Sequence, residues 1–154
     1  RTRPLHLIGI GSGTRRFMAD LAAQLDLHDC CATSDQLVLS RYDGGEEDER
    51  VRVGQTLKAP VAGRDILLLA DIVSSGLSLV YVTEWLRSRG ARSVRVCALL
   101  DRQDARIIDI PLDFVGFRAP DEVLVGYGLS SYPQFSGLSC IASIHEAGEP
   151  SFQG

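Results

Sequence analysis

The sequence predicts an α/β protein with a doubly wound, mainly parallel sheet. Short apolar runs of strand character alternate along the chain with segments of helical periodicity. This alternation is the pattern of βαβ units, in which right-handed crossovers join parallel strands. The run 64–71 is in addition continuously apolar at its centre, as expected for a strand that is covered on both faces.

The first strand and the first helix are predicted near the start of the chain. Residues 4–10 form a short apolar run of β type, which ends in the glycine-rich stretch GSGT at 11–14. Residues 15–25 then repeat apolar side chains about one helical turn apart, a spacing that indicates an amphipathic helix.

The next part of the chain is predicted to contain two strands and a polar loop. Residues 35–42 are a strand candidate, and residues 51–58 alternate apolar and polar side chains as a half-buried strand does. The segment 43–50 between them is the most polar part of the sequence, and we expect it to be a flexible loop.

The second half of the chain continues the alternation. The strand at 64–71 is followed by a helical pattern at 77–89, which Gly90 ends. Another buried strand is predicted at 92–101. Shorter strands are expected at 112–117, 123–128 and 138–144, and we expect the last of them to close the sheet.

Composition limits the classes of protein to consider. The 154 residues suit one domain with a sizeable core, and 45% hydrophobic with 23% charged residues is typical of a globular chain. A net charge of −4 predicts no nucleic-acid or anionic-membrane partner. No apolar stretch approaches the roughly 20 residues that span a bilayer. The cysteines and histidines lack metal-site spacing, and with no secretory signal we expect a cytoplasmic location. The chain begins at Arg1, which leaves open what precedes it.

The segment LLLADIVSSGLSL at 67–79 is a candidate binding site. Ligands of doubly wound sheets bind beyond the carboxyl ends of the strands, where this strand turns through Ser-Ser-Gly into a helix. Backbone N–H groups of 75–78 at a helix N-terminus, with serine hydroxyls nearby, suit a phosphate dianion. Asp71 could accept hydrogen bonds from sugar hydroxyls. Equally, Ser74 or Ser75 could simply be the N-cap of the helix.

Longer stretches carry a family resemblance. ILLLADIVSSGLSL at 66–79 resembles the 5-phosphoribosyl diphosphate (PRPP) binding motif of type I phosphoribosyltransferases. LLDRQDARIIDIPLDFVGFRAPDEVLVGYGL at 99–129 is similar to the C-terminal half of the hypoxanthine-guanine phosphoribosyltransferases. GSGT and the helix after it resemble the pyrophosphate loop of that family. The likeness runs from about Leu5 to Ile144, nearly the whole chain.

The resemblance implies a single type I phosphoribosyltransferase domain over 1–154, with a core of about 5–110 and a small hood contributed by about 111–154. Family enzymes transfer ribose 5-phosphate from Mg-PRPP to a purine nitrogen and release pyrophosphate. The expected ligand is therefore a nucleotide or PRPP, with Mg²⁺ arriving with PRPP and Asp71 as the candidate metal ligand. The resemblance further implies a homo-oligomer or, alternatively, a hetero-oligomer with another enzyme.

The resemblance also assigns roles to residues. Asp71 matches the second of two ribose-binding acids, and Ser74 stands where purine enzymes carry an aspartate that manages the proton on the base. These two are the candidate catalytic positions. The phosphate-binding residues would be Ser74, Ser75, Gly76, Leu77 and Ser78, the pyrophosphate loop Ser12, Gly13 and Thr14, and the base-binding residues Arg102, Val123 and Leu124.

Several ligand-facing positions depart from the family pattern. Ala70 replaces the first ribose-binding acid, and the neutral Ser74 is a poor general base. Arg102 stands for a lysine that recognises the 6-oxo group, and Val123 for an aromatic ring that stacks on the purine. The other changes are Ser130 for an aspartate near the metal, Ser136 for an arginine, Ser12 for a lysine, and Arg41 for the serine before Tyr42, with Arg15 or Arg16 as partial substitutes for the lysine.

Three functional interpretations follow. In the first, the chain is a purine-salvage homologue that keeps a 5′-phosphate site and has lost efficient transferase catalysis. In the second, it is a working phosphoribosyltransferase for a purine or another base, which uses Asp71 with Arg102 and Arg106. In the third, it is a structural or regulatory partner subunit of an active enzyme.

Overall fold

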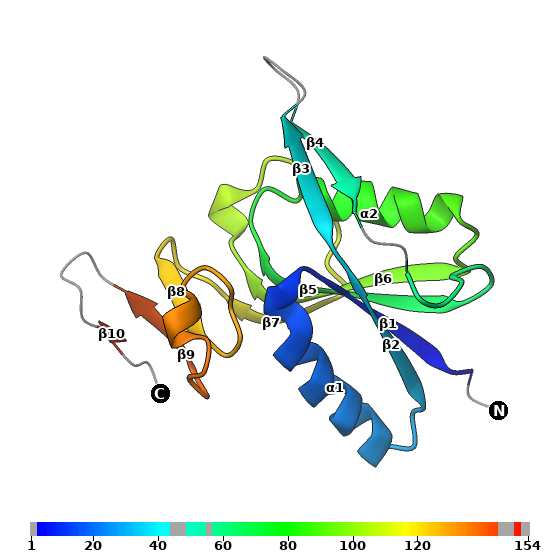
Figure 1. Ribbon diagram of the computed structural model, residues 1–154, viewed down its shortest axis with the longest axis horizontal. Helices are drawn as coiled ribbons and strands as arrows, with labels where there is room; N and C mark the ends of the chain where they lie inside the picture. Colours follow the sequence, from blue (N-terminus) through cyan, green and yellow to red (C-terminus); the bar gives the residue numbers. More distant parts are fainter. Residues whose placement is uncertain (1–2, 44–48, 55–56, 145–149, 152–154) are drawn as a thin grey trace.

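The centre of the protein is a five-stranded parallel sheet with strand order β2-β1-β5-β6-β7 (Figure 1). The structure, a computed structural model, describes residues 3–43, 49–54, 57–144 and 150–151. The parallel pairing of all five strands confirms the predicted parallel sheet of an α/β protein. Its strands are β1 (Leu5–Ile10), β2 (Ala32–Leu37), β5 (Asp65–Val73), β6 (Ser93–Asp101) and β7 (Phe114–Arg118).

The two α-helices found among the described residues, α1 (Arg15–Leu27) and α2 (Leu77–Ser88), cover opposite faces of this sheet (Figure 1). Successive strand residues point to opposite faces, so the apolar strands supply both. Leu7, Leu67 and Leu69 pack against α1, whereas Ile8, Ile66 and Leu68 lie in the cluster that contains the buried side of α2. In the described part of the chain, no helix is both long and apolar enough to cross a membrane.

Two smaller antiparallel sheets stand at the edges of the main one. The first is a hairpin of β3 (Leu39–Asp43) and β4 (Glu49–Val53). The second, called the hood below, contains β8 (Val123–Gly126), β9 (Ile141–Ile144) and β10 (Pro150–Ser151). Short 3₁₀ helices occupy Ser12–Thr14 (η1), Gln103–Ala105 (η2) and Pro133–Phe135 (η3).

The prediction of a single strand over 35–42 is wrong, because two separate strands occupy this region. β2 ends at Leu37, and β3 begins at Leu39 in the separate hairpin. The sequence of β2, ATSDQL, is polar because the strand lies at the edge of the sheet, where it pairs with β1 alone. The strand predicted at 51–58 is observed as β4, which begins earlier and is shorter than predicted. Residues 44–48 of the expected flexible loop lie outside the described part of the chain.

Two expectations about the C-terminal half also need correction. The strand predicted to close the sheet, here β9, pairs antiparallel with β8 in the hood instead. The hood was expected to begin at about 111, but β7 pairs parallel with β6 in the main sheet. The hood therefore begins after Arg118.

A buried histidine lies near the amino end of β1, between Thr33 of β2 and Ile66 of β5. The side chain of His6 is 1% exposed, and its Nδ1 is hydrogen-bonded to Thr33 Oγ1 at 2.7 Å. Its Nε2 has no hydrogen-bond partner among the described residues. Burial lowers the pKa of His6 from its ordinary value of 6.5, Arg64 lowers it further, and Asp35 and Thr33 oppose the shift.

Lowering the pH is therefore expected to destabilise the fold through His6. Because the pKa of His6 is lower in the folded than in the unfolded protein, the unfolded protein takes up a proton first as the pH falls. The stability contributed by the neutral side chain is therefore complete above the unfolded pKa and is lost as the pH falls below that value. The free energy of unfolding in urea should decrease below pH 6.5, by at most about 1.4 kcal/mol per pH unit. His6→Gln should flatten this dependence, whereas His28→Gln, at the exposed end of α1, should leave it as in the wild type. Equal slopes for His6→Gln and wild type would contradict the prediction.

Candidate functional site

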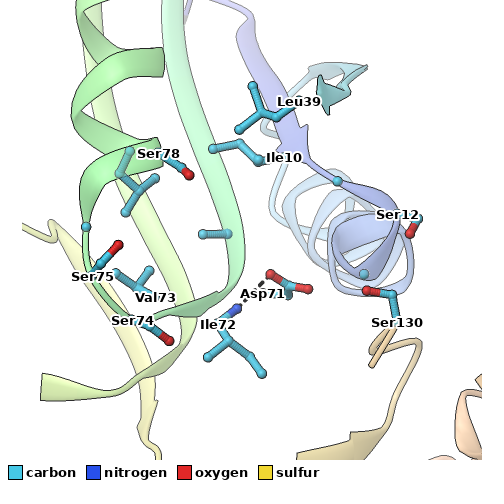
Figure 2. Close-up of a pocket in the computed structure, with 15 residues that line it drawn as sticks. Ile10, Ser12, Leu39, Asp71, Ile72, Val73, Ser74, Ser75, Ser78 and Ser130 are labelled. Carbon is cyan, nitrogen blue, oxygen red and sulfur yellow. Dashed lines mark hydrogen bonds between the residues drawn. The ribbon is translucent and has the colours of Figure 1, made fainter. Parts of the chain in front are cut away.

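A cleft of about 320 Å³ opens at the carboxyl ends of β1 and β5. These strands are neighbours in the sheet, and the helices that follow them lie on opposite faces, which makes this edge the switch point where doubly wound folds bind ligands. Residues 10–13 line one side and residues 70–76 the other. Leu39, Ser78, Leu79 and Ser130 complete the lining (Figure 2).

The turn at 74–78, called the phosphate loop below after its predicted role, has a backbone geometry that suits an anion. Gly76 is the N-cap of α2 with φ 86°, and no side chain caps the helix. The alternative that Ser74 or Ser75 is the N-cap is therefore wrong. Ser75 Oγ accepts only a long 3.4 Å bond from the Leu77 N–H. Ser74, Ser75, Gly76 and Ser78 line the cleft, whereas the Leu77 side chain is 46% exposed and lies outside its lining.

Residues 102–108, called the backing segment below, hold this loop from behind through three consecutive carbonyl groups. Val73 O accepts from Arg102 N at 2.9 Å, and Ser75 O accepts from the backbone N–H groups of Ile107 and Ile108 at 3.0 and 3.1 Å. Between them, Ser74 O accepts from Arg106 Nε at 3.0 Å.

This arrangement orients the other half of each peptide group. In a trans peptide the N–H points opposite to the C=O, and the chain contains no cis peptide among its described residues. The N–H groups of Ser74, Ser75 and Gly76 therefore point away from the backing segment and toward the cleft. Several convergent N–H groups at a helix N-terminus are an anion-binding nest.

Asp71 projects from β5 toward the turn that begins α1 (Figure 2). Its Oδ1 accepts a hydrogen bond from the Ile72 N–H at 2.8 Å, and burial raises the pKa of its carboxyl group above the ordinary value of 3.8. A Cβ built on Gly13 would collide with Asp71 Oδ2. Gly13 is thus the residue that leaves space for the acid. Ala70, one position earlier, packs in the core cluster on the α2 side.

The residues of the predicted pyrophosphate loop have two different environments. Gly11, Ser12 and Gly13 line the cleft, but Thr14 is completely buried and its hydroxyl donates to Gly11 O at 2.8 Å. Gln36 was missed by sequence reasoning. Its amide donates to Gly9 O at 3.0 Å and to Gly11 O, and so holds the turn from the edge strand β2.

The predicted base-binding residues do not line the cleft. Arg102 donates a hydrogen bond to the Glu122 carbonyl oxygen, and Val123 is 42% exposed. Leu124 is buried in a core cluster of the hood side, against which the cleft residue Ile72 packs. These residues are therefore adjacent to the cleft through Ile72, and they are not part of its wall.

Two of the remaining positions, Ser136 and Arg16, have partners away from the cleft. Ser136 Oγ donates to Pro133 O at 2.7 Å. Arg16 donates to Leu138 O at 2.9 Å and stacks over the Tyr127 ring, so its guanidinium ties α1 to the hood. Ser130 reaches the cleft from the hood (Figure 2). The side chains of Arg41 and Tyr42 lie outside the described part of the chain.

The cleft is poor in charge. Among its described lining residues, Asp71 is the only one with an ionisable side chain. The described residues contain no group of three His, Cys, Asp or Glu side chains that could hold a metal ion. A bound anion would therefore meet neutral N–H and O–H donors in this cleft, together with one half-buried acid, Asp71.

Comparison with known proteins agrees with this geometry. Residues 1–131 match the family of the phosphoribosyl transferase domain. The chain is 36% identical over 145 residues to a hypoxanthine-guanine phosphoribosyltransferase of Staphylococcus epidermidis, covering 94% of this chain and 79% of that one. It is 38% identical over 141 residues to the enzyme of that name from Bacillus subtilis, covering 91% and 77%.

Solved structures give the same result. The crystal structure of a hypoxanthine phosphoribosyltransferase from Staphylococcus aureus superposes with a TM-score of 0.83 at 32% identity, covering 96% of this chain and 80% of that one. A hypoxanthine phosphoribosyltransferase from Trypanosoma cruzi has a TM-score of 0.86 at 26% identity, covering 94% and 75%. The fold, the sequence identities and the match over residues 1–131 together show that this chain belongs to the phosphoribosyl transferase family.

Proposed function

We propose that the cleft binds the 5′-phosphate of a purine nucleotide or of PRPP, as a hypoxanthine-guanine phosphoribosyltransferase site does, and that the transfer step itself is slow. The observation that carries the binding proposal is the phosphate loop, whose N–H groups are turned into the cleft by bonds to its carbonyl groups. The preference for a purine is proposed from the similarity to hypoxanthine-guanine phosphoribosyltransferases at 34–38% identity.

The slow step follows from the charge of the cleft. Phosphoribosyl transfer by family enzymes is expected to pass through an oxocarbenium-like state and to expel pyrophosphate, so it gains from groups that stabilise developing charge. Here Ser74 is neutral, and among the described lining residues no side chain is cationic. A positioned general base typically contributes about 10²–10⁴-fold in rate, and that contribution is missing at position 74.

An active enzyme with divergent residues is the second candidate, and one observation favours it. Burial raises the pKa of Asp71, which brings this carboxyl group closer to the range in which a side chain exchanges protons at neutral pH. The two arginines of this interpretation are engaged elsewhere, because Arg106 pairs with Asp101 and Arg102 bonds to Glu122 O. Asp71 would therefore act without them.

Mg²⁺ fits the described residues only weakly. The cleft presents one carboxylate, Asp71, next to hydroxyl and amide groups. Mg²⁺ commonly binds through one or two carboxylates together with substrate phosphates, so a diphosphate ligand would have to supply most of the oxygens. The phosphate loop needs no metal to bind a monophosphate.

Inosine 5′-monophosphate is accordingly expected to bind saturably in the presence of EDTA, as measured by isothermal titration calorimetry. Inosine, which lacks the phosphate, is the matched ligand control and should give no saturable heat. Removal of Mg²⁺ should leave the affinity for the monophosphate unchanged and should lower the affinity for PRPP. Absence of heat with inosine monophosphate, guanosine monophosphate and PRPP would overturn the proposal. It would favour the partner-subunit interpretation, which predicts co-purification with an active phosphoribosyltransferase in fixed ratio.

A further inference from the structure

One side chain takes part in holding the phosphate loop. Of the four hydrogen bonds from the backing segment to the carbonyl groups of residues 73–75, three come from backbone N–H groups. The fourth comes from Arg106 Nε, which donates to Ser74 O at 3.0 Å. The orientation of the peptide between Ser74 and Ser75 therefore depends on a side chain that lies behind the loop.

The guanidinium group of Arg106 is fixed by a second partner. Its Nη2 forms an ion pair with Asp101 Oδ1, and the two side chains are only 14% and 10% exposed. Its aliphatic part lies against the loop, since a Cβ on Gly76 would be 3.1 Å from Arg106 Cδ. A planar guanidinium can serve two acceptors at fixed angles, which a lysine ammonium on a flexible stem does not reproduce.

The position of Arg106 also excludes it from the wall of the cleft. It is not among the lining residues, and its charge faces the carboxylate of Asp101. Asp101 ends β6, the strand next to β5, so the ion pair connects the loop to the rigid sheet.

We propose that Arg106 is a positioning residue for the phosphate site: its guanidinium holds the Ser74 carbonyl so that the Ser75 N–H faces the bound anion. This inference rests on the proposed function, because it concerns the same site. Arg106 acts through the peptide group, and its positive charge is not what attracts the phosphate.

A charge-conserving substitution separates these two roles. Arg106→Lys keeps the cation beside Asp101 but loses the planar fork to Ser74 O. We expect this variant to lower the affinity for inosine 5′-monophosphate by about 10- to 100-fold, because that is the usual effect of losing a hydrogen bond made by a charged group. The double variant Asp101→Asn with Arg106→Gln, which leaves no unpaired charge in the interior, should weaken the ligand similarly. A lysine variant that binds as the wild type does would overturn the proposal.

The matched control is Arg92→Lys. Arg92 also forms a fork with an aspartate, donating to Asp65 Oδ1 at 2.8 Å and to Asp65 Oδ2, but at the amino ends of β5 and β6. Its replacement should leave the ligand affinity unchanged.

A second readout does not need the ligand. In ¹H–¹⁵N spectra of the unliganded protein, the amide signals of Ser75 and Gly76 should shift in Arg106→Lys and remain in place in Arg92→Lys. Unshifted amide signals in Arg106→Lys would overturn the positioning role. If the wild-type protein binds no nucleotide while the Ser75 amide still shifts, the positioning of the loop stands and the proposed function fails.

Discussion

Replacing Ser74 by aspartate is expected to raise the rate of phosphoribosyl transfer from PRPP by about 100-fold or more, the usual contribution of a positioned general base. Ser74 lines the cleft, and its carbonyl group is already fixed by Arg106. A carboxylate at this position would therefore extend from a well-held backbone into the cleft, where the proposed function places the base and its proton.

The assay should use PRPP, Mg²⁺ and hypoxanthine, guanine or xanthine, with nucleotide formation followed by absorbance. Ser74→Asn is the control, because the asparagine side chain has nearly the shape of aspartate and cannot accept a proton at neutral pH. The double variant with Ala70→Glu tests the first ribose-binding acid as well. Since Ala70 is packed in the α2 core cluster, the longer side chain should cost stability, so the single variant is the cleaner test.

The baseline rate decides the wider question. A wild-type turnover in the ordinary enzymatic range of about 1–10³ s⁻¹ would contradict the slow-transfer proposal and favour the active enzyme with Asp71. A slow wild type that Ser74→Asp does not accelerate would show that the missing aspartate is not what limits the rate.

Replacing Gly76 by alanine is expected to abolish measurable nucleotide binding and to lower the free energy of unfolding by about 1–3 kcal/mol. Gly76 has φ 86°, a left-handed conformation that side chains rarely adopt. The added Cβ would stand 2.9 Å from Ile108 O and 3.1 Å from Arg106 Cδ. Relief of these contacts must move the loop away from the backing segment, which disperses its N–H groups.

Gly63→Ala is the matched control for this prediction. Gly63 also has a left-handed φ of 71°, but a Cβ there meets no atom within 4 Å, and the residue lies in the turn before β5 and outside the cleft. It should show a loss of stability from the backbone conformation alone and bind inosine monophosphate as the wild type does. Calorimetry and urea unfolding measure the two effects, and full binding by Gly76→Ala would contradict the role given to the loop.

The elements that periodicity predicted well are those whose burial is decided locally. The first helix and the helix after the phosphate loop repeat their apolar residues at the helical spacing, and both form close to the predicted bounds. The central strand β5 is apolar on both faces because helices cover both. By contrast, the edge strand β2 is polar and was not separated from β3, since an edge strand needs little apolar surface to pair with one neighbour.

The candidate site was predicted as a list of residues, and the structure divides that list by environment. The resemblance selected 74–78 and Asp71, which do line the cleft except for Leu77. It also selected Thr14 and Leu124, whose side chains are buried as supports. Gln36 and Arg106 hold the two turns from other parts of the chain, and no local pattern marks a side chain that bonds to a distant carbonyl group.

The α/β class, the two helices, the glycine turns and the resemblance to phosphoribosyltransferases can all be read from the amino-acid sequence, because each depends on short-range spacing or on a contiguous motif. The pairing of β9 in the hood and of β7 in the main sheet depends on long-range contacts, since strand pairing depends on which edges are open. The orientation of the N–H groups of 74–76 toward the cleft likewise depends on long-range contacts. The carbonyl groups that set this orientation are bound by residues 102–108, about thirty positions further along the chain.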